Sequence, residues 1–143
     1  MKIVTRTFSV LTDRYNQFIC ITDQMHTAVM ESGVQNGMVT VMTKHTTTGI
    51  AINENVECLQ RDIEELLTRL APEDYPYSHA RMLRDYGSTA GNPTGHLKGH
   101  LTGNHCHFVI ADGKVVRGSA QDVFLCEFDG PSKRTFCVQV MGE

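Results

Sequence analysis

The chain has 143 residues, of which 41% are hydrophobic and 20% are charged, and its formal net charge is -3. These values are typical of a globular protein, and we expect a single domain over residues 1–143. The acidic balance and the lack of a basic run argue against a nucleic-acid partner, and no apolar run reaches the roughly 18 residues of a membrane span. We therefore expect no membrane partner, and a small molecule or another protein chain as the binding partner.

The cysteines and the N-terminal stretch indicate a compartment. The five cysteines are odd in number and form no CxxC pair, which predicts free thiols. The stretch MKIVTRTFSV has neither the long apolar segment of an export signal nor an Arg-rich pattern, so we expect a cytoplasmic protein. Four cysteines lie among strand-forming residues, where a thiol behaves as a small buried hydrophobe. They are Cys20, Cys106, Cys126 and Cys137.

The first third of the chain predicts two strands, a helix and a third strand. Residues 2–10 and 17–22 are rich in β-formers, and the turn residues between them favour a hairpin. A helix capped by Thr22 or Asp23 is expected to place Met25, Ala28 and Val29 on one face and to end at Gly33. The run at residues 38–44 reads as a further strand.

The next segment contains the most regular helical pattern of the chain. After a β-like run at residues 46–52, apolar residues follow spacings of three and four from Val56 to Leu70, and Pro72 lies just beyond. This pattern predicts an amphipathic helix that packs on a sheet. Residues 73–95 are polar and rich in turn formers, so we expect a long loop there, and loops of that length are often functional.

The last 40 residues contain three β-like runs with short connections between them. They cover residues 105–111, 114–128 and 134–141. Short connections favour antiparallel neighbours. Most consecutive strands are thus expected to be joined by short turns, with a few helices between them. This order of elements predicts an α+β fold with antiparallel, sandwich-like sheets.

Four of the seven histidines lie between residues 91 and 108, in GNPTGHLKGHLTGNHCHF. His96 and His100 have the i, i+4 spacing that would place both rings on one face of a helical turn, although three glycines weaken that helix. His105 and His107 have the i, i+2 spacing that places two rings on one face of a strand. Each of these four histidines can be interpreted either as a solvated side chain or as a metal ligand.

Three further polar residues lie where sheets and helices meet. His45 follows a predicted strand, Asn53 precedes the amphipathic helix, and Asp62 lies at the edge of the apolar face of that helix. Turn formation and helix capping explain such residues as readily as catalysis does. The pattern alone leaves both interpretations open.

The same residues also carry a family resemblance. The motifs HTTTGIAINEN, SH at residues 78–79, GNPTGHLKGHLTG, the DGK turn, QDVFLCEFDGP and the terminal GE occur in the order and spacing of the YjbQ-like family, also called the secondary thiamine-phosphate synthase family. The resemblance covers about residues 38–143. It implies a compact fold of antiparallel sheets with a few helices, assembled as a homotrimer.

The resemblance also implies a metal site and residue roles. The recurring histidines of the family correspond to His45, His79 and His96, and its recurring Asn and Asp correspond to Asn53 and Asp62. We therefore expect the three histidines to bind a divalent metal, most simply zinc, because three neutral imidazoles leave a fourth position open as in catalytic zinc sites. Asp62 and Asn53 are the candidate catalytic residues, with Asp62 as a base or as the group that orients a histidine.

Two functions follow, and the sequence leaves both open. In the first, the protein is an enzyme that acts on a phosphorylated small molecule, with Lys98 and Lys44 as candidate phosphate-binding residues. In the second, it is a trimer that binds a metal or a ligand without turning it over. The family resemblance implies weak thiamine-phosphate synthase activity, but Ala120 replaces the tryptophan of the common GTWQ motif and His105 replaces a small hydroxyl residue. We therefore expect at most slow coupling.

Overall fold

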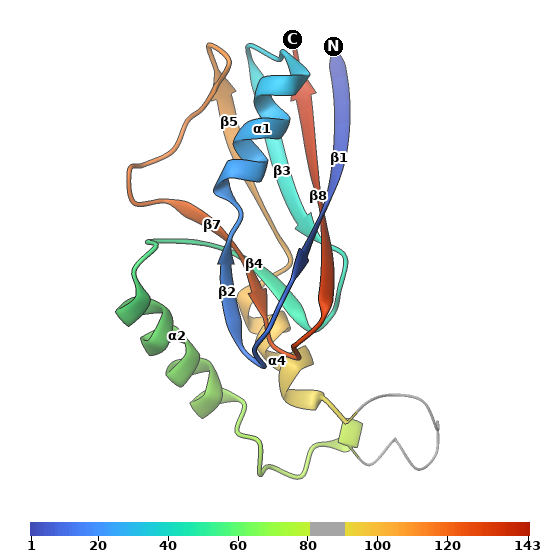
Figure 1. The fold of residues 1–143 in the computed structure, drawn as a ribbon, viewed down its shortest axis with the longest axis vertical. Coiled ribbons are helices and arrows are strands. Elements are labelled where there is room, and N and C mark those ends of the chain that lie inside the picture. Colours follow the sequence, from blue (N-terminus) through green and yellow to red (C-terminus); the bar gives the residue numbers. More distant parts are fainter. Residues whose placement is uncertain (81–90) are drawn as a thin grey trace.

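The computed structural model describes residues 1–80 and 91–143, and two antiparallel sheets that share one core dominate it (Figure 1). The strands are β1 (Lys2–Leu11), β2 (Gln17–Cys20), β3 (Gly37–Thr43), β4 (Thr48–Asn53), β5 (His105–Ala111), β6 (Lys114–Val115), β7 (Asp122–Glu127) and β8 (Lys133–Gly142). The helices are α1 (Thr22–Ser32), α2 (Glu57–Leu70) and α4 (Pro93–Thr102). The fold is α+β with antiparallel sheets, which confirms the predicted fold class.

The larger sheet has the strand order β1-β8-β3-β5-β6, with antiparallel pairing throughout. Alternate residues of its central strands are buried, namely Val39 and Val41 in β3 and Phe136, Val138 and Val140 in β8. Side chains alternate between the faces of a strand, so these residues form one inner face. Together with Cys106, Phe108 and Ile110 of β5, that face contributes half of the buried residues of the main hydrophobic core.

The smaller sheet has the order β2-β7-β4, and its central strand is buried on both faces. Val123 and Leu125 of β7 point into the main core, whereas Phe124 and Cys126 point into a second, smaller cluster. The second cluster lies under α2, which contributes Leu67. The smaller sheet is therefore the middle layer between the larger sheet and α2.

The helices occupy distinct places around the sheets. Helix α1 buries Met25, Ala28 and Val29 in the main core and ends at Gly33, whose φ of 65° is a left-handed conformation that glycine adopts without strain. Helix α4 lies at the end of the sheets opposite the two chain termini (Figure 1). None of the helices within the described residues is long and apolar enough to cross a membrane.

The pairing of the strands corrects two predictions. The expected hairpin of the first two strands is wrong, because β1 pairs with β8 and β2 pairs with β7 in the other sheet. The segment from 133 likewise leaves the sheet of β7, so only the β5–β6 turn joins antiparallel neighbours as expected. Short connections here pass from one sheet to the other, which the turn residues alone do not reveal. The predicted loop at residues 73–95 lies partly outside the described residues, and α4 begins at Pro93.

The cysteines are free, as expected, but only two of the four strand cysteines are buried. Cys106 and Cys126 lie in the two hydrophobic clusters, whereas Cys137 is half-buried and Cys20 is exposed. Burial raises the pKa of the Cys106 thiol to about 11 and that of the Cys126 thiol to about 12. These two thiols therefore act as hydrophobic residues at neutral pH.

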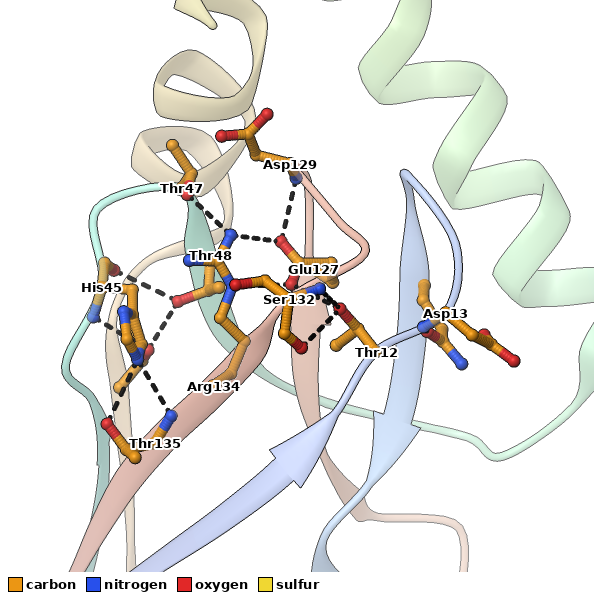
Figure 2. A network of polar contacts seen from close by, with 12 residues as sticks. Thr12, Asp13, His45, Thr47, Thr48, Glu127, Asp129, Ser132, Arg134 and Thr135 are labelled. Carbon is orange, nitrogen blue, oxygen red and sulfur yellow. Dashed lines mark hydrogen bonds and ion pairs between the residues drawn. The ribbon is translucent and has the colours of Figure 1, made fainter. Parts of the chain in front are cut away.

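A buried ion pair joins the two sheets where β7 leads into β8 (Figure 2). The Arg134 guanidinium donates from Nε and Nη2 to the two carboxylate oxygens of Glu127, each at 2.6 Å. Glu127 is 0% exposed and Arg134 is 8% exposed. Thr12 donates its hydroxyl to the same carboxylate, and Arg134 also donates to the Thr47 hydroxyl at 3.0 Å. The pair thus connects both sheets with the segment that precedes β4.

The environment of Glu127 keeps its carboxyl ionised. Burial raises the pKa, but hydrogen bonds from Arg134, the backbone N–H of Asp129 and the Thr12 hydroxyl together outweigh burial and lower it below the usual value. The same carboxylate raises the pKa of Arg134. A buried charge is tolerated only when its hydrogen bonds are satisfied, and this one has four.

We predict that Arg134→Met lowers the free energy of unfolding by about 3 kcal/mol, because it leaves the Glu127 carboxylate buried without its counter-ion. The measurement is urea unfolding at pH 7. Arg6→Met is a matched control, since Arg6 pairs with Glu31 at the surface and its loss should cost less than about 1 kcal/mol. Equal losses in the two variants would contradict the role of the pair.

The pair also predicts a pH dependence. Because the folded-state pKa of Glu127 lies below its unfolded value, the pair adds stability that is fully present above about pH 4.5 and is lost as the pH falls through the folded pKa. The difference in unfolding free energy between the wild type and Glu127→Gln should therefore shrink below pH 4.5. A difference that stays constant down to pH 3 would contradict this assignment.

Candidate functional site

The turn between β3 and β4 presents His45 next to the start of β8. The Nε2 atom of His45 accepts the backbone N–H of Thr135 at 2.9 Å and lies 3.2 Å from its hydroxyl oxygen (Figure 2). The carbonyl oxygen of His45 accepts the Thr48 hydroxyl at 3.1 Å. The ring is therefore held by the residue that directly follows Arg134 of the buried ion pair.

Helix α4 packs very closely on the same turn, and its glycines make this possible. A methyl group added at Gly99 would lie 2.9 Å from the Thr48 carbonyl oxygen and 3.0 Å from that of Thr46. One added at Gly95 would lie 2.9 Å from the Phe128 carbonyl oxygen. The glycines that weaken the helical propensity of this stretch thus bring α4 against the chain.

His79 and His96 form a pair of neighbouring rings. Their centroids are 4.9 Å apart at an interplanar angle of 54°. The Nδ1 atom of His79 is buried and has no hydrogen-bond partner within the part of the chain that the structure describes. Buried polar atoms almost always have a partner, and this nitrogen is one of three exceptions among the described residues, with the side-chain oxygens of Asn16 and Asn92.

His96 also faces the His45 turn across a polar pocket of about 420 Å³, which we call the histidine cleft. His100, one helical turn beyond His96, lies on its rim and is exposed. The described residues that line it are Thr43, Lys44, His45, Thr46, Thr48, His96, Gly99, His100 and Asn104. The structure thus brings His45 and His96 to one cleft, with His79 packed against His96.

The cleft keeps its two half-buried imidazoles neutral. Burial lowers the pKa of His96, and the neighbouring His79 lowers it further, whereas Asp129 acts in the opposite direction. Burial also lowers the pKa of His45, and the Arg134 guanidinium adds to this effect. Neutral imidazole is the form that binds metals and accepts protons.

Lys98 lies outside this cleft, in a cluster at the start of α4. Its side chain is 2% exposed, with Nζ 3.8 Å from a Glu73 carboxylate oxygen and 5.6 Å from the centre of the Tyr15 ring. The same oxygen accepts the Thr94 hydroxyl at 2.9 Å and the Tyr15 hydroxyl at 3.0 Å. These contacts tie the segment that leads to His79 to the helix that carries His96.

The remaining predicted residues lie at other places in the chain. Lys44 is exposed on the rim of the histidine cleft. Asn53 is exposed at the end of β4, lines a separate apolar pocket and accepts the backbone N–H of Glu54. Asp62 is exposed on α2. Within a single chain the structure does not bring Asn53 or Asp62 to the cleft, and their catalytic roles stay predictions.

Sequence reasoning missed the residues that hold the site together. Thr135 and Glu73 belong to no recognisable motif, because their contacts join segments that are far apart in the chain. Arg134 did leave a signal. In a strand with alternating burial it falls on the same face as Phe136 and Val138, and a charge on an apolar face requires a partner.

Among residues 1–80 and 91–143, no three histidine, cysteine, aspartate or glutamate side chains gather closely enough to hold a metal ion. The Nε2 lone pair of His45 is engaged by the Thr135 N–H, so His45 is not poised as a ligand in this arrangement. Of the three histidines that were expected to bind a metal, His79 and His96 have rings in contact with each other.

The family described as UPF0047 protein YjbQ-like matches residues 6–143. The chain belongs to this family. A UPF0047 protein of Methanocaldococcus jannaschii is 33% identical over 137 residues, covering 95% of this chain and 93% of its own. The UPF0047 protein YugU of Bacillus subtilis is 31% identical over 137 residues, covering 96% and 98%. These names assign no activity.

Solved structures show the same fold. A YbjQ-like protein of unknown function from Sulfolobus solfataricus superposes with a TM-score of 0.91 at 31% identity, covering 99% of each chain. A protein of the YjbQ/UPF0047 family from Clostridium acetobutylicum gives a TM-score of 0.86 at 36% identity, covering 95% of this chain and 99% of its own. The predicted family and fold are therefore confirmed, whereas the function of the family is not established by these relatives.

We predict that His96 titrates below the ordinary histidine pKa of about 6.5, since burial and His79 both disfavour its cation. His79→Gln should move the pKa of His96 upward. NMR titration of the imidazole C–H signals measures both, with His26→Gln on α1 as a control that leaves His96 unchanged. A pKa for His96 at or above 6.5 in the wild type would contradict the described surroundings.

Proposed function

We propose that the histidine cleft binds a divalent metal ion, with zinc as the preferred metal, and that the protein is an enzyme acting on a phosphorylated small molecule. The observation that carries the proposal is the Nδ1 atom of His79, which is buried beside the His96 ring and has no hydrogen-bond partner among residues 1–80 and 91–143. Imidazole nitrogen is a preferred ligand of zinc, and nickel, copper or iron are its competitors at such sites. Two of the three expected ligands are thus adjacent and chemically suited.

We propose that His45, the third expected ligand, binds the metal after its ring changes tautomer. Binding through Nδ1 puts the ring proton on Nε2, which then donates to the Thr135 hydroxyl oxygen at 3.2 Å instead of accepting the Thr135 N–H. The N–H left without a partner costs about 1 to 3 kcal/mol, which a metal bond can offset. The Thr135 hydroxyl is therefore the group that supports His45 as a ligand.

The chain's own residues would handle the phosphate. Lys44 on the rim supplies an exposed positive charge for it, and His100 faces the same space. A metal in the cleft would supply Lewis-acid polarisation of a phosphate or carbonyl oxygen. The cluster with Glu73 engages Lys98, so we assign phosphate binding to Lys44 and a positioning role to Lys98. Asp62 and Asn53 stay candidates for proton transfer.

Metal content of variants tests the site. We predict that His45→Ala, His79→Ala and His96→Ala each lose the bound zinc, because each removes one of three ligands. His100→Ala is the matched control on the same helix and should keep it. Elemental analysis per chain, after circular dichroism has shown that each variant is folded, makes the measurement. Loss confined to His96→Ala and His100→Ala would replace this site by a local pair on α4.

Removal of the metal distinguishes the hypothesis that the protein is an enzyme from the hypothesis that it only binds a metal or ligand. An enzyme should lose turnover of phosphorylated small molecules on chelation and regain it with zinc, whereas a trimer that only holds a metal or ligand should merely become less stable. The weak thiamine-phosphate synthase activity stays a prediction. Ala120, which replaces the usual tryptophan, is exposed in the turn between β6 and β7.

We also propose a homotrimer in the cytoplasm. Several large apolar side chains are exposed in the single chain, among them Leu66 and Leu70 on α2 and Leu97 and Leu101 on α4. Exposed apolar groups and open strand edges favour association with another chain. We predict three times the chain mass in light scattering at micromolar concentration. A monomer mass over that range would contradict the proposal.

A further inference from the structure

We propose that His105 and His107, with Met42 of the neighbouring strand, form a binding site for cuprous copper on the outer face of the five-stranded sheet. These histidines lie outside the three-histidine site described above. The proposal is independent of the proposed function, since its ligands are different side chains and its metal is different, and Asn104 is the one described residue that it shares with the lining of the histidine cleft.

The sheet geometry places the three side chains together. His105 and His107 are two apart in β5 and both are exposed, while the intervening Cys106 is buried. Their ring centroids are 6.4 Å apart and the ring planes differ by only 20°. Met42 of β3 is the direct partner of His105 in the sheet register and is 46% exposed. Directly opposed residues have Cβ atoms about 5 Å apart, so the thioether can reach the rings.

Asn104 prepares His105 as a ligand. The Nδ1 atom of His105 lies 2.7 Å from the side-chain oxygen of Asn104. An amide oxygen can only accept a hydrogen bond, so Nδ1 carries the ring proton and Nε2 keeps its lone pair. A histidine that binds a metal typically donates its other ring N–H to such an oxygen, which fixes both the tautomer and the orientation.

The donor set selects the metal. A thioether is a soft ligand that favours cuprous copper, and imidazole also binds copper well. The three ligands of this site are two imidazoles and one thioether. The site therefore does not require a cluster of three His, Cys, Asp or Glu side chains. Cys137 follows Met42 in the same row of the sheet, but its sulfur lies 3.7 Å from the Thr7 hydroxyl on the far side. We therefore leave Cys137 out of the site.

The test is an anaerobic titration with cuprous copper against a chromophoric chelator. It uses protein in which the exposed thiols are removed by Cys20→Ser and Cys58→Ser, since free thiols bind this ion themselves. His105→Gln and His107→Gln should each weaken one copper equivalent at least about tenfold. His26→Gln, Cys137→Ser and His96→Ala should leave that equivalent unchanged. The replaced histidine ligands are exposed, so we expect their variants to fold, and circular dichroism checks the variants of the half-buried Cys137 and His96.

Asn104, whose side-chain oxygen contacts the His105 ring, provides a sharper pair of variants. Asn104→Ala should weaken copper binding about tenfold, because it releases the tautomer of His105. Asn104→Asp should restore it, since a carboxylate accepts the same N–H. If copper binds to the surface without an organised site, Asn104→Ala and Asn104→Asp should bind it with equal affinity. Equal affinities would overturn the assignment of Asn104.

Methyl NMR identifies the thioether. Addition of one copper equivalent should shift the methyl signal of Met42 and leave that of Met30, a more exposed methionine on α1, in place. Equal shifts of both signals, or unchanged affinity in His105→Gln and His107→Gln, would show an adventitious ion only and overturn the proposal. Because the copper readout does not depend on His45 or His79, failure here leaves the zinc proposal standing, and the reverse also holds.

Discussion

The buried pair of Glu127 and Arg134 is the constraint on which the architecture of the site depends. It lies where the chain passes from the small sheet to the large one, with both charges taken out of water and the carboxylate held by four hydrogen bonds. Desolvation makes such a pair costly unless its geometry is maintained, so the segments that supply partners must stay in place. Those segments carry Thr12, Asp129 and Thr47, and Thr47 directly precedes β4, whose first residue Thr48 lines the histidine cleft.

The residues of the histidine cleft are positioned by contacts that begin next to this pair. Thr135, the neighbour of Arg134, holds the His45 ring through its backbone N–H. The glycines of α4 let the helix approach the His45 turn until a single added methyl group would collide with backbone oxygens. The cluster around Glu73 then draws the segment before His79 toward the same helix. These contacts place His45 and His96 in one cleft and the His79 ring against that of His96.

Much of the local structure could be predicted from the sequence, because local structure depends on local patterns. The amphipathic helix before Pro72 and the alternation around His105 and His107 both follow from spacing alone. The sheet assignment of the strands could not be predicted, since turn residues determine that a chain reverses but not which sheet it joins next. Lys98 shows the same limit, because a lysine beside a histidine motif suggests phosphate binding until its contact with Glu73 is seen.

The central claim is that His79 and His96, joined by His45, hold a metal ion in the cleft. Anomalous diffraction at the zinc edge, from crystals of the wild-type protein grown with zinc, tests it most directly. The account predicts a peak about 2.0 to 2.1 Å from a nitrogen of His79 and of His96, with His45 as the third ligand. A zinc peak bound by His96 and His100 alone, or a cleft without a peak while zinc occupies other sites, would contradict it.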